Sequence, residues 1–132
     1  MPASAILNNI VIVIVDDDAS IRFSLREFLI RKGATVFACP DAMQGLQAVR
    51  AHHPNVVLSD ISLPNRDGFE LLQDIRSLGP GQNGDVPVIA MTALAGVVDF
   101  GPTIDNGFQA QLQKPFRPDQ LLATVSSTLG SG

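Results

Sequence analysis

Short apolar segments of strand length alternate along this chain with segments whose apolar residues recur at helical spacing. A continuously apolar strand suits a parallel sheet that is buried on both faces, with a helix between successive strands. The pattern therefore predicts an α/β fold: a doubly wound, open, five-stranded parallel sheet with helices on both faces. We expect its strands at residues 10–15, 34–38, 56–59, 86–91 and 110–113.

The helices expected between these strands have recognisable ends, with one exception. Asp41, three residues before Gln44, resembles a capping box, and Pro118 suits the first turn of the last helix. The fourth helix should lie within "GVVDFGPTIDNG", residues 96–107, but Gly101 and Pro102 interrupt that segment. Because a proline inside a helix costs about 3 kcal/mol, we expect this helix to be short, distorted or partly unwound.

Size and composition restrict the class of protein. A chain of 132 residues has the usual size of one domain. With 17% charged residues and a net charge of -4, it lacks the basic surface expected of a nucleic-acid binder. The apolar start has no basic segment and stops at Asp16, far short of the ~20 residues that span a bilayer. We therefore expect a cytoplasmic domain with no membrane or nucleic-acid partner.

Reactive side chains follow four of the five predicted strands. Asp16 and Asp17 follow the first, Asp60 the third, Thr92 the fourth and Lys114 the fifth. Sites on open α/β sheets form where the carboxyl ends of the strands meet, so these side chains should converge. Acidic oxygens beside a hydroxyl and a lysine suit a hard divalent cation such as Mg²⁺ together with an anionic group.

Each residue also has a structural interpretation. Asp17 and Asp18 would stabilise the positive N-terminus of the first helix, Thr92 could be an ordinary strand-end hydroxyl, and Lys114 a surface lysine. Asp60 is harder to explain in this way, because an acid at the end of an apolar strand is costly without partners. The convergence of all these residues, and no single position, favours a functional site.

Four segments in the expected order resemble the receiver domain of two-component response regulators. They are "VIVDDDASIR", "VVLSDISLPNRDGFELL", "PVIAMTA" and "QKPF", each at the end of a predicted strand. The resemblance covers about residues 10–129 and implies a flavodoxin-like strand order, 2-1-3-4-5. It also implies a single receiver domain over residues 1–132, either a single-domain regulator or the receiver of a hybrid sensor kinase.

The resemblance assigns the phosphorylation chemistry to particular residues. Asp60 would accept a phosphoryl group from a phosphohistidine on a sensor histidine kinase or a histidine phosphotransfer protein. Thr92 and Lys114 would each bind a phosphoryl oxygen, and the Lys114-Pro115 bond would be cis. The protein would be a phosphorylation-switched regulator that assists its own phosphoryl transfer and autodephosphorylation, not a turnover enzyme.

The resemblance also implies a magnesium site. Asp17 and Asp60 would bind Mg²⁺ directly, Asp16 largely through water, and the main-chain carbonyl of Ser62 would complete the protein ligands. Positive charge is required there because the phosphoryl-transfer transition state spreads negative charge over its oxygens.

The conformational switch departs from the family pattern. In the family Thr92 would move toward the phosphoryl group while an aromatic residue three positions before the lysine turns inward, but here that position is Gln111. Because segment 96–107 is also interrupted, we expect signalling to use another surface, such as the first helix. A homodimer is a further expectation.

Two other classes compete with this interpretation. "IVDDDAS" fits the D-x-D-x-[TS] pattern of haloacid-dehalogenase-like phosphohydrolases, with Asp16 as nucleophile and Asp18 as general acid. That family needs a further acidic pair beyond the lysine, where only Asp119 follows, and it leaves Asp60 unexplained. A flavin-binding module would need a phosphate-binding loop after the first strand and an aromatic residue of the Trp or Tyr type, and the chain has neither of these residues.

Overall fold

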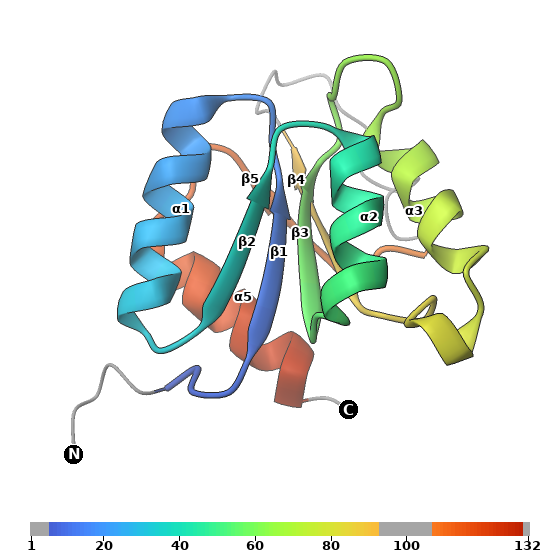
Figure 1. The fold of residues 1–132 in the computed structure, drawn as a ribbon. Coiled ribbons are helices and arrows are strands. Elements are labelled where there is room, and N and C mark those ends of the chain that lie inside the picture. Colours follow the sequence, from blue (N-terminus) through green and yellow to red (C-terminus); the bar gives the residue numbers. More distant parts are fainter. Residues whose placement is uncertain (1–5, 93–106, 131–132) are drawn as a thin grey trace.

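The computed structural model describes residues 6–92 and 107–130. Five parallel strands form one sheet in the order β2-β1-β3-β4-β5, which confirms the predicted doubly wound fold and its strand order (Figure 1). The strands are β1 (Val11–Val15), β2 (Thr35–Cys39), β3 (Val56–Asp60), β4 (Val88–Thr92) and β5 (Ala110–Gln113).

Helices cover both faces of this sheet. One face carries α1 and α5 and the other carries α2 and α3, as Figure 1 shows. A short 3₁₀ helix, η2, follows α3. The helices are α1 (Ala19–Arg31), α2 (Ala42–His52), α3 (Gly68–Arg76), η2 (Pro80–Gln82) and α5 (Pro118–Gly130).

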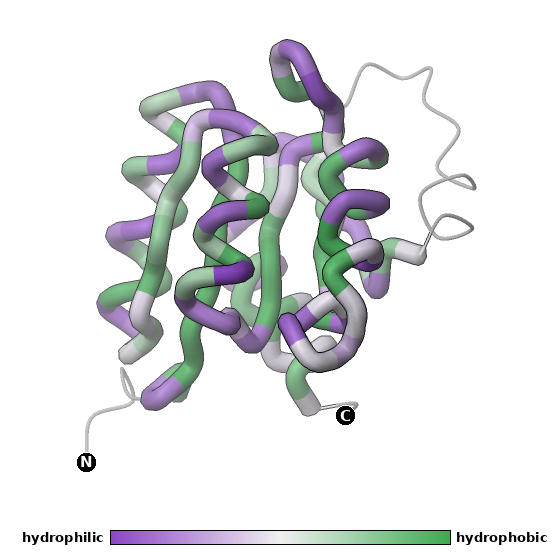
Figure 2. The backbone as a smooth tube through the Cα atoms, turned by 45° about the vertical axis from the view of Figure 1, so that its right-hand side comes forward, coloured by the Kyte–Doolittle hydropathy of each residue, from purple (hydrophilic) through white to green (hydrophobic). Residues whose placement is uncertain are grey.

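The central strands supply the core on both faces of the sheet. Every residue of β3 and β4 is buried, and neighbouring residues of β1 face opposite helical layers. Val13 packs with α2 and α3, whereas Ile12 and Ile14 pack with α1 and α5. In Figure 2 the central strands are accordingly mostly green, and the helices alternate between green and purple. The alternation of side-chain direction therefore gives each helical layer its own apolar contact.

Aspartates cap three of the helices at their N-termini. Asp18 accepts hydrogen bonds from the main-chain N–H groups of Ser20 and Ile21 at the start of α1. Asp41 caps α2, as predicted, and Asp67 forms a reciprocal capping box with Glu70 on α3. Each cap satisfies N–H groups that have no partner inside the helix.

The structure modifies some predicted boundaries and leaves one untested. β3 continues through Asp60, one residue beyond the prediction, because Asp60 pairs in register with Met91 of β4. β4 begins at Val88 and not at residue 86, after Pro87, which has no main-chain N–H to donate. The expected fourth helix at 96–107 falls almost entirely outside the described residues. Within the described ranges, no helix has the length and apolar character needed to cross a membrane.

Candidate functional site

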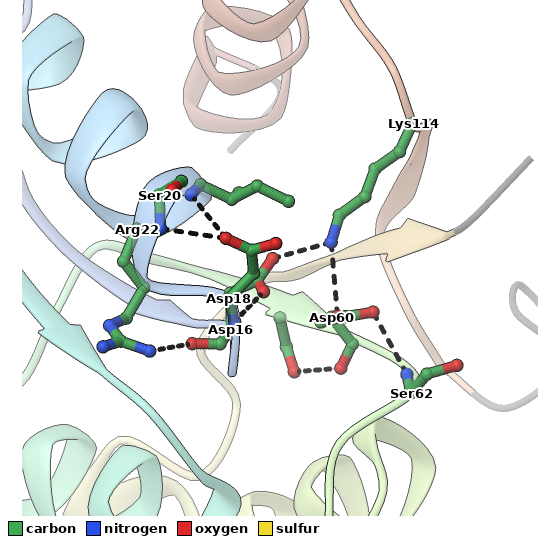
Figure 3. Close-up of polar contacts among 9 residues, drawn as sticks. Asp16, Asp18, Ser20, Arg22, Asp60, Ser62 and Lys114 are labelled. Carbon is green, nitrogen blue, oxygen red and sulfur yellow. Dashed lines mark hydrogen bonds and ion pairs between the residues drawn. The ribbon is translucent and has the colours of Figure 1, made fainter.

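The carboxyl edge of the sheet brings the predicted side chains together. Asp60 is the last residue of β3 and Thr92 the last residue of β4, while Asp16 directly follows β1 and Lys114 directly follows β5. β1 and β3 are neighbours in the sheet, so their terminal acids lie side by side. Figure 3 shows Asp16, Asp60 and Lys114 pointing toward one another at this edge.

Asp16, Asp17 and Asp60 form an acidic cluster. One carboxylate oxygen from each lies within 4.8 Å of the others. Asp16 is fully buried and Asp60 is only 6% exposed, whereas Asp17 is exposed to solvent. Oxygen ligands on an octahedral Mg²⁺ lie up to about 4.2 Å apart, twice the metal–oxygen distance, so the cluster has nearly the required size. The donor set therefore fits a hard divalent cation.

Lys114 is the cation that contacts this cluster. Its Nζ donates to Asp16 Oδ2 at 2.7 Å and to Asp60 Oδ2 at 3.2 Å. Its main-chain N–H donates to Thr92 O at 2.7 Å, and the following Lys114-Pro115 peptide bond is cis, as predicted. Among the described residues, the three carboxylates outnumber the Lys114 ammonium and the Arg22 guanidinium, which reaches Asp16 O, so the site retains negative charge that a divalent cation would offset.

Burial and neighbouring charge shift the pKa of Asp60 and the pKa of Lys114. Burial raises the pKa of the Asp60 carboxyl, and the negative charge of Asp16 adds to this shift, against the opposing effect of Lys114. Burial alone would lower the pKa of Lys114, but its hydrogen bond to Asp16 and the charge of Asp60 raise the pKa above its usual value. Lys114 therefore stays positively charged at neutral pH, beside a carboxylate whose ionised form is disfavoured.

The loop after β3 fixes the position of Asp60. The Ser62 N–H donates to Asp60 Oδ1 at 3.1 Å, and the Ser59 hydroxyl donates to Asp60 O at 2.9 Å. Gly68, the first residue of α3, lies so close that a Cβ atom there would meet Asp60 O at 2.6 Å. A side chain at position 68 would therefore displace the main chain of Asp60, which gives a steric reason for glycine in "LPNRDG".

The two predicted switch residues lie on neighbouring strands. Thr92 is 3% exposed, and its Oγ1 is buried without a hydrogen-bond partner among the described residues. Gln111 lies on β5 opposite Ala90 of β4, and its Oε1 likewise has no partner in the described part of the chain. A buried hydroxyl without a partner at the strand end is available to bind an added oxygen.

Asp18 and Asp119 occupy positions that do not suit the phosphohydrolase alternative. Asp18 caps α1, which matches its structural interpretation. Asp119 is exposed on α5 and pairs with Arg117 Nε at 3.1 Å. Of the acids in the phosphohydrolase interpretation, the proposed general acid Asp18 is thus a helix cap, and Asp119, the acid that follows the lysine, is a surface residue.

Arg22 is a site residue that the sequence interpretation did not identify. Its Nη1 donates to the main-chain carbonyl of Asp16 at 2.7 Å, from one turn inside α1 (Figure 3). Arg22 stands six positions after Asp16, and a helix starts between the two residues, so the arginine side chain can reach back to the aspartate. This spacing was the signal that the sequence offered. Arginine is common on helix surfaces, so that spacing alone was not specific.

Comparisons with known proteins agree with this arrangement. The family model "Response regulator receiver domain" matches residues 12–126. A 14.6 kDa uncharacterized protein of Leptolyngbya boryana is 37% identical over 114 residues, which are 86% of each chain. Response regulator MprA of Mycobacterium ulcerans is 33% identical over 118 residues, 89% of this chain and 49% of MprA.

The chain is also similar to a solved receiver-domain structure. The receiver domain of NtrX from Brucella abortus matches 92% of this chain and 99% of its own, with a TM-score of 0.82 and 27% identity. The chain spans about half the length of the curated regulators that it matches. The family match, the fold and the acidic edge place the chain in the response regulator receiver family, whose members are phospho-acceptor signalling domains.

Proposed function

We propose that Asp60 is the phosphoryl acceptor of this receiver domain. The observation that carries the proposal is the meeting of Asp60 with Asp16, Asp17 and Lys114 at one edge of the sheet. Asp60 ends a fully buried strand, so its position is fixed by the core, yet its carboxylate lies at the rim. The phosphodonor is a phosphohistidine on a sensor histidine kinase or a histidine phosphotransfer protein.

In the proposed reaction a carboxylate oxygen of Asp60 attacks the phosphorus atom. An oxygen–phosphorus bond forms while the phosphorus–nitrogen bond of the donor breaks, and the electron pair of that bond leaves with the imidazole. Lys114 Nζ, which touches Asp60 Oδ2, binds one oxygen of the transferred group. The unpartnered Thr92 hydroxyl donates to another. The chain's contribution is alignment and charge stabilisation, the main requirements of phosphoryl transfer.

Asp17 and Asp60 would hold a Mg²⁺ ion, with Asp16 acting largely through water and the Ser62 carbonyl as a further ligand. When bound, the ion supplies positive charge that neutralises the phosphoryl oxygens. Support comes from the oxygen-only donor set and from the excess of acids over cations at this edge. The same residues would assist autodephosphorylation, by aligning water with the acyl phosphate.

The phosphodonor would approach along α1. A groove of about 590 Å³ lies between α1 and the segment after β5, with Ile21, Leu25, Pro115 and Phe116 among its lining residues. Lys114 also lines this groove, which therefore opens beside the acidic cluster. An apolar surface next to the acceptor suits a protein partner that must deliver a phosphohistidine to it.

The extent of the domain, its location in the cell and its two switch residues belong to the same proposal. Residues 1–132 make up a single receiver domain that acts in the cytoplasm, and Thr92 and Gln111 change position on phosphorylation. Gln111 has an unpartnered buried oxygen, so its side chain can exchange one conformation for another without breaking a hydrogen bond to a described residue.

Intact mass measurement after incubation with acetyl phosphate and Mg²⁺ tests the assignment of Asp60. We expect one added phosphoryl group in the wild type, none in Asp60→Asn and a reduced yield in Asp16→Asn. Asp18→Asn is the matched control, because asparagine also caps helices well, and it should be labelled like the wild type. Labelling that persists in Asp60→Asn would overturn the proposal.

A further inference from the structure

Arg22 connects α1 to the end of β1. It lies in the first turns of α1, where its own N–H donates to Asp18 O at 3.0 Å. Its side chain is partly buried and turns back toward the sheet, where Nη1 reaches Asp16 O at 2.7 Å. In Figure 3 the guanidinium lies on the opposite side of Asp16 from Lys114. Arg22 thus contacts the main chain of the acidic cluster and not its carboxylates.

Asp16 is held at every polar atom. Its N–H donates to Cys39 O at 3.0 Å, and its carbonyl accepts from Arg22. Its Oδ1 accepts from the Asp18 N–H at 2.9 Å, and its Oδ2 accepts from Lys114. Of these contacts, the bond from Arg22 is the one that fixes the carbonyl, and it is strong because the donor is charged.

Fixing the carbonyl of Asp16 also fixes the peptide plane that leads into Asp17, which restricts the directions open to the Asp17 side chain. The peptide group is planar, so the Asp16 carbonyl and the Asp17 N–H rotate as one unit. Asp17 is exposed, and its side chain makes no hydrogen bond or ion pair with the residues that the structure describes. The direction of its carboxylate toward Asp60 therefore depends on the main chain, which Arg22 holds.

We propose that Arg22 is a positioning residue of the acidic cluster: by holding the Asp16–Asp17 peptide plane it aims the Asp17 carboxylate at Asp60 and so strengthens divalent-cation binding. The inference rests on the proposed function, because it assumes that the cluster binds Mg²⁺. It adds a residue whose side chain contacts the main-chain carbonyl of Asp16 and would act through the main chain of the cluster.

The positive charge of Arg22, taken alone, predicts an effect on Mg²⁺ affinity opposite to that of the positioning role. A guanidinium near a cation site repels the cation, so removing that charge would tighten Mg²⁺ binding. Positioning predicts that removing Arg22 weakens binding. Arg22→Met removes both charge and donors at similar length, and Arg22→Lys keeps the charge and one donor group. Arg26→Met is the matched control, since Arg26 is on the same helix and, among the residues that the structure describes, pairs only with Glu27 at the surface.

Calorimetric titration with MgCl₂ measures the first consequence. We expect the dissociation constant to rise about tenfold in Arg22→Met, because the ion would then have to order the Asp16–Asp17 turn as it binds. Arg22→Lys should restore part of the affinity, and Arg26→Met should match the wild type. Unchanged or tighter binding in Arg22→Met would overturn the inference, provided that the wild type binds. A wild type that binds no Mg²⁺ would instead overturn the proposed function.

Amide hydrogen exchange of the metal-free protein gives a readout that does not depend on the ion. The Asp18 N–H donates to Asp16 Oδ1, so it reports how firmly the turn is held. We expect its exchange to become about tenfold faster in Arg22→Met and to change less in Arg22→Lys, while amides in the centre of β3 keep their protection. Equal loss of protection in β3 and at Asp18 would show a general loss of stability and would contradict positioning.

Discussion

The two edges of the sheet differ in how well their polar groups are matched with hydrogen-bond partners. At the amino edge, Arg76 Nη1 donates to the carbonyls of Gly84 and Val86, and the Asn55 side chain accepts from the Val11 N–H. Polar atoms there meet complementary partners. At the carboxyl edge, three carboxylates meet near one lysine, and a buried threonine hydroxyl has no partner among the described residues.

This difference separates the parts of the molecule that stabilise the fold from those arranged for a ligand. Satisfied hydrogen bonds to buried groups stabilise the native state, whereas clustered like charges and unpartnered buried atoms destabilise it. A chain that keeps such a cluster at one edge loses stability there, which an added cation and an added anion would restore under the proposed function. Substitutions at Arg76, Asp17 and Asp60 test this difference between the two edges.

The largest effect should come from the amino edge. Arg76→Ala removes the hydrogen bonds to Gly84 O and Val86 O and should lower the free energy of unfolding by about 3 kcal/mol. Urea denaturation measures this loss, and Mg²⁺ affinity should stay unchanged. Arg66→Ala is the control, because Arg66 forms exposed ion pairs, each worth less than about 1 kcal/mol. If Arg76→Ala lowered the free energy of unfolding no more than Arg66→Ala does, the proposed difference between the two edges would be contradicted.

The next effect concerns ligand binding at the carboxyl edge. Mg²⁺ at about 100 times its dissociation constant should raise the free energy of unfolding by roughly 2.7 kcal/mol, because it binds only the folded cluster. In Asp17→Asn most of this gain should disappear, although the fold is retained, since Asp17 is exposed. Thermal unfolding with and without Mg²⁺ gives the comparison. Full stabilisation of Asp17→Asn would place the ion elsewhere.

The smallest effect concerns the charge of Asp60 itself. Its pKa is raised above the ordinary value of 3.8, so the folded state holds the proton more tightly than the unfolded chain. The charged form therefore costs stability, and this cost grows as pH rises from about 3.8 through the raised pKa. Without Mg²⁺, Asp60→Asn should therefore be more stable than the wild type at pH 7, by less than the gain that Mg²⁺ binding gives the wild type.

The pH dependence of this stability difference checks its origin. Urea denaturation should show a smaller difference between Asp60→Asn and the wild type at pH 4 than at pH 7. In Asp60→Asn, Lys114 keeps its hydrogen bond to Asp16, which is the shorter of its two contacts, so the lysine is not left unpaired. A variant less stable than the wild type at pH 7 would mean that the Lys114 contact outweighs burial and repulsion.

Most of the fold could be predicted from the sequence because its elements are locally encoded. Apolar strand segments, aspartate caps and the proline at the start of the last helix each depend on a few adjacent residues, and the apolar segments gave the strands within about two residues. The ends of β3 and β4 were less predictable, because they depend on pairing with a neighbouring strand that is distant in the sequence.

The residues of the site that could be predicted from the sequence are those whose positions follow from the topology of the sheet. Asp16, Asp60, Thr92 and Lys114 each end or follow a strand, so the parallel sheet alone brings them together. The contact from Arg22 to a main-chain carbonyl depends on where α1 begins and on one side-chain conformation, and neither leaves a specific pattern in the sequence.

Diffraction from crystals soaked in Mn²⁺ tests the central claim most directly, because Mn²⁺ prefers the same oxygen ligands as Mg²⁺ and scatters anomalously. The account predicts one strong anomalous peak in contact with carboxylate oxygens of Asp17 and Asp60. An empty acidic cluster at saturating Mn²⁺, or an ion bound only at other acids of the surface, would contradict it.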